Sequence, residues 1–111
     1  MAAIANLRID QGASFSSDVT VTNSAGDVVD LSGYTTSARM AKSYGASSYV
    51  DITASVASDP TTGVIELTLT DTQTATLDAP SRYVYDVYIT QTSSSTVTRV
   101  IEGVITVNPK V

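Results

Sequence analysis

The feature that most constrains this chain is the alternation of apolar and polar residues, which recurs with a period of two in segment after segment. In the clearest case Ile65, Leu67 and Leu69 alternate with one glutamate and two threonines. Successive side chains of a β-strand point to opposite faces, so this pattern predicts strands with one buried face. The predicted strands lie within residues 6–10, 14–22, 34–42, 50–56, 65–70, 83–89 and 96–107.

The last predicted strand is irregular, because its apolar residues change parity between Val100 and Ile101. This change predicts a β-bulge or a strand that crosses between two sheets. The connections carry turn residues: Asn and Gly in 23–26, Asp, Pro and Gly in 59–63, and a run of serines in 92–95. These residues favour tight turns between consecutive strands.

One segment departs from the strand pattern. Thr70 and Gln73 have the spacing of a capping box, in which each side chain bonds the backbone of the other residue. Asp71 suits the positive end of a helix dipole, and Pro80 prevents a helix from continuing. We therefore predict one short helical turn near residues 71–77.

Together these elements predict an all-β fold, namely an Ig-like antiparallel β-sandwich of about seven strands. Serine and threonine make up 32 of the 111 residues, and threonine suits half-exposed strand faces while serine suits turns. A chain of 111 residues has the size of one ordinary domain. Residues 1–111 are therefore expected to form a single sandwich domain.

The composition argues against several classes of partner and chemistry. Cysteine and histidine are absent, which removes disulfides, thiolates and the usual general base. The net charge is −5 and the six basic residues are scattered, whereas nucleic acids and anionic membranes require clustered Lys and Arg. No apolar run approaches the roughly 20 residues of a membrane span. We expect neither nucleic acid nor membrane as a partner.

No catalytic, cofactor-binding or metal-binding residue is predicted. The serines have no histidine to activate them, and Lys42 and Lys110 belong to no Ser-Lys motif. Asp27 and Asp30, the nearest approach to a calcium loop, are interpreted as a turn residue and a strand-end residue. The sequence therefore predicts a protein that is not an enzyme, with no cofactor and no small-molecule substrate.

The tyrosines divide into two groups. Tyr34, Tyr83 and Tyr85 share the parity of core positions, and we expect their rings in the core with the hydroxyls at its rim. The others are the predicted contacts with a partner: Tyr88 lies on the opposite strand face, and Tyr44 and Tyr49 flank the loop of residues 45–48.

Five motifs follow one another along the chain. They are LRIDQGASF (7–15), DLSGY (30–34), GVIELTLT (63–70), YVYDV (83–87) and RVIEGVITV (99–107). This ordered set resembles small virion proteins of tailed phages of the cyanophage type, and it is similar to the N-terminal domain family of baseplate upper proteins. The similarity spans essentially the whole chain.

The resemblance implies an Ig-like sandwich that serves as a repeated assembly module of the virion, in the tail, baseplate or neck. Its partners would be other virion proteins and copies of itself. Gly12, Gly33 and Gly103 would allow a bend, a turn and a kink in the last strand, respectively. The chain ends at Val111 without the region that follows this domain in baseplate upper proteins, so a capsid decoration protein is an alternative.

An alternative of another class is an adhesin module that binds a host receptor or glycan. Against it, the chain has no tryptophan, and no aromatic cluster around a carboxylate or amide is evident in the sequence.

Overall fold

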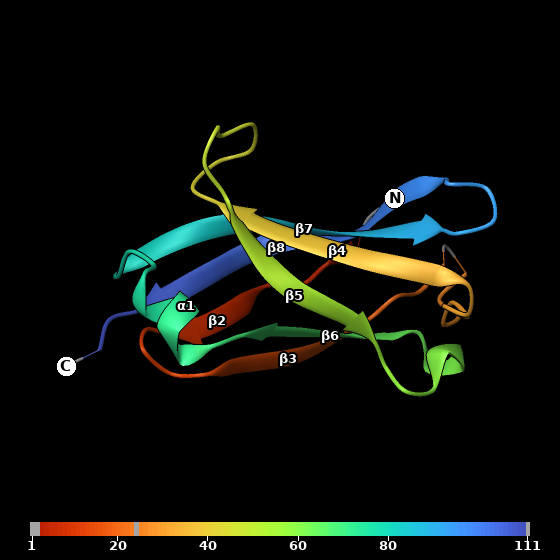
Figure 1. Cartoon of the computed structure of the whole chain (residues 1–111), viewed down its shortest axis with the longest axis horizontal. Helices are drawn as coiled ribbons and strands as arrows, with labels where there is room; N and C mark the ends of the chain where they lie inside the picture. Colours follow the sequence, from red (N-terminus) through yellow and green to blue (C-terminus); the bar gives the residue numbers. More distant parts are fainter. Residues whose placement is uncertain (1–2, 24, 111) are drawn as a thin grey trace.

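The computed structural model describes residues 3–23 and 25–110 and shows an all-β molecule with little helix (Figure 1). Each predicted segment corresponds to one of strands β2 to β8. The strands are β1 (Ala3–Ile4), β2 (Leu7–Asp10), β3 (Phe15–Thr20), β4 (Tyr34–Ala41), β5 (Val50–Val56), β6 (Val64–Leu69), β7 (Ser81–Gln91) and β8 (Val97–Asn108). Two short helical elements join strands, the 3-10 turn η1 (Pro60–Thr62) and the helix α1 (Asp71–Ala75).

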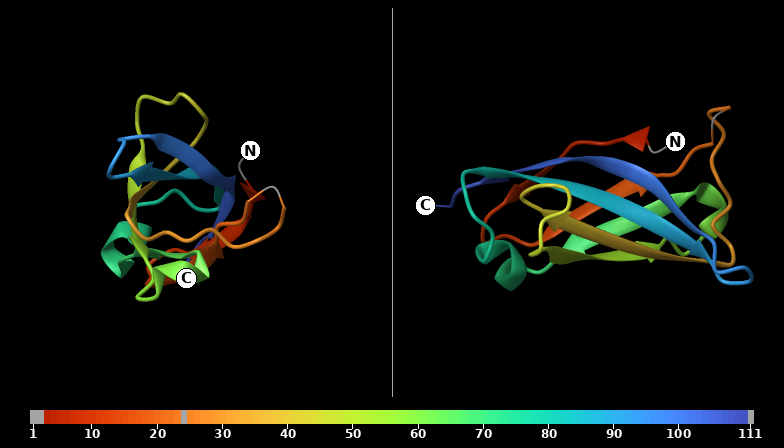
Figure 2. Two further views of the ribbon diagram at one scale, coloured as in Figure 1. Left: turned by 90° about the vertical axis from the view of Figure 1, so that its right-hand side faces the viewer. Right: turned by 90° about the horizontal axis from the view of Figure 1, so that it is seen from above.

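The strands form one mixed sheet that rolls into two facing layers and is nearly barrel-shaped (Figures 1 and 2). The strand order is β1-β8-β7-β4-β5-β6-β3, and β2 also pairs with β8. Strand β5 belongs to both layers, because its first residues pair with β4 in one layer and its last residues pair with β6 in the other. The all-β, sandwich-like fold predicted from the alternation is confirmed.

The pairing of the N-terminal strands differs from the predicted antiparallel arrangement, because β1 and β2 run parallel to β8. All other strand pairs are antiparallel. Antiparallel neighbours can be joined by a short hairpin, whereas a parallel pair needs a long connection. Here the connection comprises nearly the whole chain, so no local sequence pattern predicts the parallel pairing.

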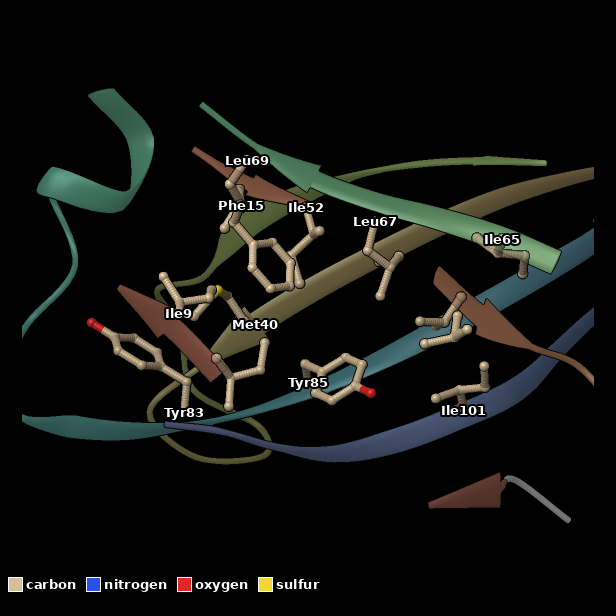
Figure 3. Packing of buried hydrophobic residues seen from close by; sticks show 14 of the residues in the cluster. Ile9, Phe15, Met40, Ile52, Ile65, Leu67, Leu69, Tyr83, Tyr85 and Ile101 are labelled. Atoms are coloured by element: carbon tan, nitrogen blue, oxygen red, sulfur yellow. The ribbon is translucent and has the colours of Figure 1, made fainter. Parts of the chain in front are cut away.

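Inward-facing side chains of the two layers fill one apolar core (Figure 3). On β6, Ile65, Leu67 and Leu69 are buried, as the alternation requires. Tyr83 and Tyr85 are buried on β7, as predicted. Removal of this apolar surface from water is the main term that stabilises the fold.

Two local predictions from the sequence are confirmed. The backbone N–H of Gln73 donates to Thr70 Oγ1 at 3.2 Å, and the backbone N–H of Thr70 donates to Gln73 Oε1 at 2.8 Å. This capping box begins α1, which ends slightly earlier than predicted, at Ala75. On β8 the pairing with β7 skips Val100, which is the bulge that the change of parity indicated.

The N-terminal strand is interrupted between β1 and β2, where Ala5 turns its carbonyl toward β8. A Cβ atom at Gly103 would lie 2.2 Å from that carbonyl oxygen, so only glycine leaves room for it. The hydroxyl of Tyr85, from within the core, donates to the same oxygen. Asn6 Oδ1 accepts from the backbone N–H of Val104 at 3.1 Å. Gly103 therefore serves the close approach of two strands, and the kink that the resemblance implied there stays a prediction.

The turn between β2 and β3 is fixed by α1. Thr74, whose side chain is fully buried, accepts a hydrogen bond from the N–H of Gly12 at 3.0 Å and donates to the carbonyl of Ala13 at 2.9 Å. Gln11 Nε2 donates to the carbonyl of Leu77 at 2.9 Å. The helix thus holds the corner at which the chain passes from one layer to the other.

Candidate interaction surface on the outer face of the sheet

The outer face of β5, β4, β7 and β8 carries a row of charged residues. In register, Arg39 lies between Asp51 on β5 and Asp86 on β7, and Asp86 lies opposite Glu102 on β8. Arg39 Nε is 3.2 Å from an Asp51 oxygen, and the Arg99 guanidinium is 3.3 Å from Glu102 and 4.0 Å from Asp86. Exposed pairs of this kind are each worth about 0–1 kcal/mol. These ion pairs therefore contribute little to the stability of the fold, and their main effect is to make this face polar.

The loop between β4 and β5, residues 42–49, stands above this face (yellow in Figures 1 and 2). Between the loop and the sheet lies a hollow of about 220 Å³. The loop contributes Tyr44 and Tyr49 to its lining, and β7 contributes Asp86 and Tyr88. The remaining lining residues are Arg39, Met40, Ala41, Ser43, Gly45, Ala46, Val84 and Tyr85.

The three tyrosines predicted to contact a partner thus converge on one hollow. Tyr44 is 57% exposed and Tyr49 is 49% exposed, whereas Tyr88 is half-buried on the outer side of β7. Their convergence depends on the pairing of β4 with β7, which brings the loop over a strand about 40 residues away in sequence. The contact with a partner itself remains a prediction.

The sequence showed no aromatic cluster around a carboxylate, but in the folded chain Asp86 lines the same hollow as three tyrosines. The side chain of Asp86 is 20% exposed. Part of this arrangement could be predicted from the sequence of β7, which is rich in tyrosine. Alternation puts Asp86 on the outward face of the strand, together with Tyr88 and not with Tyr85. Its neighbours from the loop could not be inferred, since loop conformation is not set by alternation.

Two tyrosine rings already hold cations of the chain. The Arg39 guanidinium carbon lies 4.2 Å from the centroid of the Tyr49 ring while pairing with Asp51. Lys42 Nζ lies 4.7 Å from the Tyr83 ring centroid and 3.3 Å from an oxygen of Asp78. Both arrangements combine a ring face with a carboxylate around one cation, which is a favourable geometry for cation–π attraction.

A second hollow, of about 340 Å³, lies beside the first on the same face. It shares Arg39 and Tyr88 with the first hollow and is otherwise lined by Ser37, Ala38 and Val97. Val97 is 60% exposed.

The remaining tyrosines with core parity lie where the alternation placed them. The backbone N–H of Asp78 donates to the hydroxyl of Tyr83 at 2.9 Å, and Tyr34 is half-buried at the edge of the core. Burial raises the pKa of Tyr85 to about 12. This phenol therefore stays protonated at neutral pH and keeps its donor for Ala5.

Asp30, interpreted from the sequence as a strand-end residue, lies outside the strands, in the loop before β4, and forms a local turn. Its Oδ1 accepts from the backbone N–H of Ser32 at 2.9 Å. Hydrogen bonds from the side chain and the backbone of Ser32 lower the pKa of the Asp30 carboxyl. Within residues 3–23 and 25–110, no three acidic side chains gather as a metal site would require.

No model of a known protein family matches the chain, and no curated protein matches it significantly. In the part of the chain that the structure describes, no helix has the length and apolar character to cross a membrane.

Proposed function

We propose that this chain is a non-enzymatic structural module of a tailed-phage virion, present in many copies, that attaches to neighbouring virion proteins through the outer face of β4 and β7. The observation that carries the proposal is the convergence of Tyr44, Tyr49 and Tyr88 on one recessed surface. Tyrosine is enriched in protein interfaces because it offers a large ring and a polar hydroxyl at small entropic cost. The resemblance to small virion proteins supports a place for the chain in a virion, in the tail, baseplate or neck.

The test is the number of copies incorporated into particles. Quantitative mass spectrometry of purified virions should find the wild-type chain at a fixed ratio to the major capsid protein, and electron density should place it at repeated positions. The triple substitution of Tyr44, Tyr49 and Tyr88 with serine should reduce that ratio at least tenfold, about 1.4 kcal/mol or more of lost contact energy. The variant must keep its β-type circular dichroism spectrum.

Val28→Ser is the matched control, because Val28 is exposed and lies outside the lining of both hollows. It should be incorporated as the wild type is. Absence of the chain from purified particles would contradict the virion role, and unchanged incorporation of the triple variant would contradict the surface. Copies on the capsid shell rather than on the tail would identify the alternative, a decoration protein.

A second candidate function is a sugar- or receptor-binding module for host attachment. The observation that favours it is that three tyrosines and Asp86 line one hollow, since rings and a carboxylate can also hold a sugar. Binding of the isolated domain to a glycan array, lost on serine substitution of the tyrosines, would support this candidate. A silent array would leave the structural module as the better account.

A further inference from the structure

We propose that the tyrosine-lined hollow binds one basic side chain, an arginine or a lysine, presented by a neighbouring protein. This inference rests on the proposed function, since it names the chemistry of the partner at the same surface. The size of the hollow is the first reason. About 220 Å³ is below the roughly 300 Å³ at which sites for small molecules begin, so the hollow suits a single side chain.

The second reason is how the charges in the hollow are paired. Its lining holds one basic side chain, Arg39, which already pairs with Asp51, and one acidic side chain, Asp86. The Asp86 side chain is four-fifths covered by neighbouring groups. Among the described residues no hydrogen bond to it is formed, and its ion pair with Arg99 has a separation of 4.0 Å, while Arg99 lies closer to Glu102. A partly desolvated carboxylate is best satisfied by a charged donor. The net charge of the chain, −5, favours the approach of a basic partner.

The third reason is that the chain uses the same arrangement twice for its own cations. Arg39 lies against Tyr49 and Asp51, and Lys42 lies against Tyr83 and Asp78. Tyr44, Tyr88 and Asp86 line the hollow together and supply the same two kinds of group, aromatic rings and a carboxylate. Within the described residues no cation lies over the rings of Tyr44 or Tyr88. An incoming guanidinium or ammonium group would complete this third set.

The probe is N-acetyl-arginine N-methylamide, titrated into the isotope-labelled domain while backbone amide shifts are recorded. Saturable shifts are expected at residues 39–49 and 84–88, and they should weaken with added salt. The neutral isostere, the same compound made from citrulline, should produce shifts only at concentrations at least tenfold higher. Since the isolated domain is used, this result does not depend on whether the chain belongs to a virion.

Asp86→Asn removes the charge and keeps the shape, and it should weaken binding of the arginine probe about tenfold. Asp18→Asn is the matched control, because it changes the net charge equally on the outer face of the other layer, where Asp18 lies opposite Glu66. It should leave the affinity unchanged. Amide spectra of both variants report whether the fold is kept.

Three results would overturn the inference. Equal affinity for the arginine and citrulline probes would show that charge is not recognised, and unchanged affinity of Asp86→Asn would show that this carboxylate is not the acceptor. Shifts at the same amides on addition of neutral oligosaccharides, without shifts from the arginine probe, would assign the hollow to a sugar.

Discussion

The two edges of the rolled sheet are built differently. At one edge β3 pairs with β6 through six consecutive antiparallel residue pairs, from Phe15–Leu69 to Thr20–Val64. At the other edge β1 and β2 pair with β8 in parallel and are interrupted at Ala5. The first edge is regular, and its pairing requires only the alternation of apolar and polar residues along the two strands.

The second edge depends on particular side chains instead. Gly103 makes room for the Ala5 carbonyl, Tyr85 donates to it, and Asn6 replaces a missing backbone acceptor for Val104. Where main-chain pairing is continuous, many substitutions are tolerated, because the backbone itself supplies the hydrogen bonds. Where pairing is broken, single residues take over that task. Outside the core positions, we therefore expect single substitutions to be more damaging where β8 meets the N-terminal strands than along β3.

Substitution of Gly103 with alanine should have the largest effect. The added Cβ would overlap the Ala5 backbone, and we expect a loss of about 3 kcal/mol in the free energy of unfolding, measured by urea denaturation. Gly33→Ala is the control: its φ is +79° and nothing lies within 4 Å of the added atom. Its cost should be about 1 kcal/mol, from backbone strain alone. Equal costs would remove the distinction between the edges.

Tyr85→Phe should have an intermediate effect. It leaves the Ala5 carbonyl without its donor, and an unsatisfied, partly buried acceptor costs about 1–2 kcal/mol. Hydrogen exchange should accelerate at the amide of Ala5, which bonds the carbonyl of Glu102. Tyr83→Phe, which removes a buried hydroxyl near Asp78, should leave that amide unchanged. Equal acceleration in both variants would indicate general loosening of the core.

The same tyrosine predicts a dependence on alkaline pH. The pKa of Tyr85 is raised from 10.0 to about 12 in the folded state, chiefly by burial. Its contribution to stability is therefore complete below pH 10 and is lost as the pH rises from 10 through 12. Denaturation of the wild type across this interval should show that loss, and Tyr85→Phe should lack it. Parallel curves for the two proteins would contradict the assignment.

The smallest effect is expected at the regular edge. Asp18 on β3 lies directly opposite Glu66 on β6, and like charges at such positions repel. Glu66→Lys should raise the free energy of unfolding by about 0.5 kcal/mol at low salt and have no effect near about 1 M salt. The double variant Asp18→Lys, Glu66→Lys restores like charges and should return to the wild-type stability.

The sequence allowed most of the elements to be predicted, because the forces that form them act over a few residues. The strands followed from alternation, α1 from Thr70 and Gln73, and the bulge from the change of parity at Val100. The burial of Tyr83 and Tyr85 and the outward position of Tyr88 followed from the same alternation. These properties require no knowledge of which strands are neighbours.

The composition of the candidate site could be predicted only in part. Tyr44, Tyr49 and Tyr88 were identified from parity and from the loop they flank, but the participation of Arg39 and Asp86 was not. The register of β4 on β7 decides which charged residues lie beside which tyrosines, and a shift by one residue would exchange the two faces. That register is fixed by packing across the whole core.

By itself, then, the amino-acid order determined where strands begin, turn and end, and which side of each strand faces inward, since these depend on nearby residues. Only the tertiary structure decided that the first strand runs parallel to the last, with Asn6 and Val104 in contact 98 positions apart, and that the loop of residues 42–49 overhangs Asp86. Such contacts join segments that are distant in sequence. Their free energy arises from packing of the complete molecule, so no local pattern encodes them.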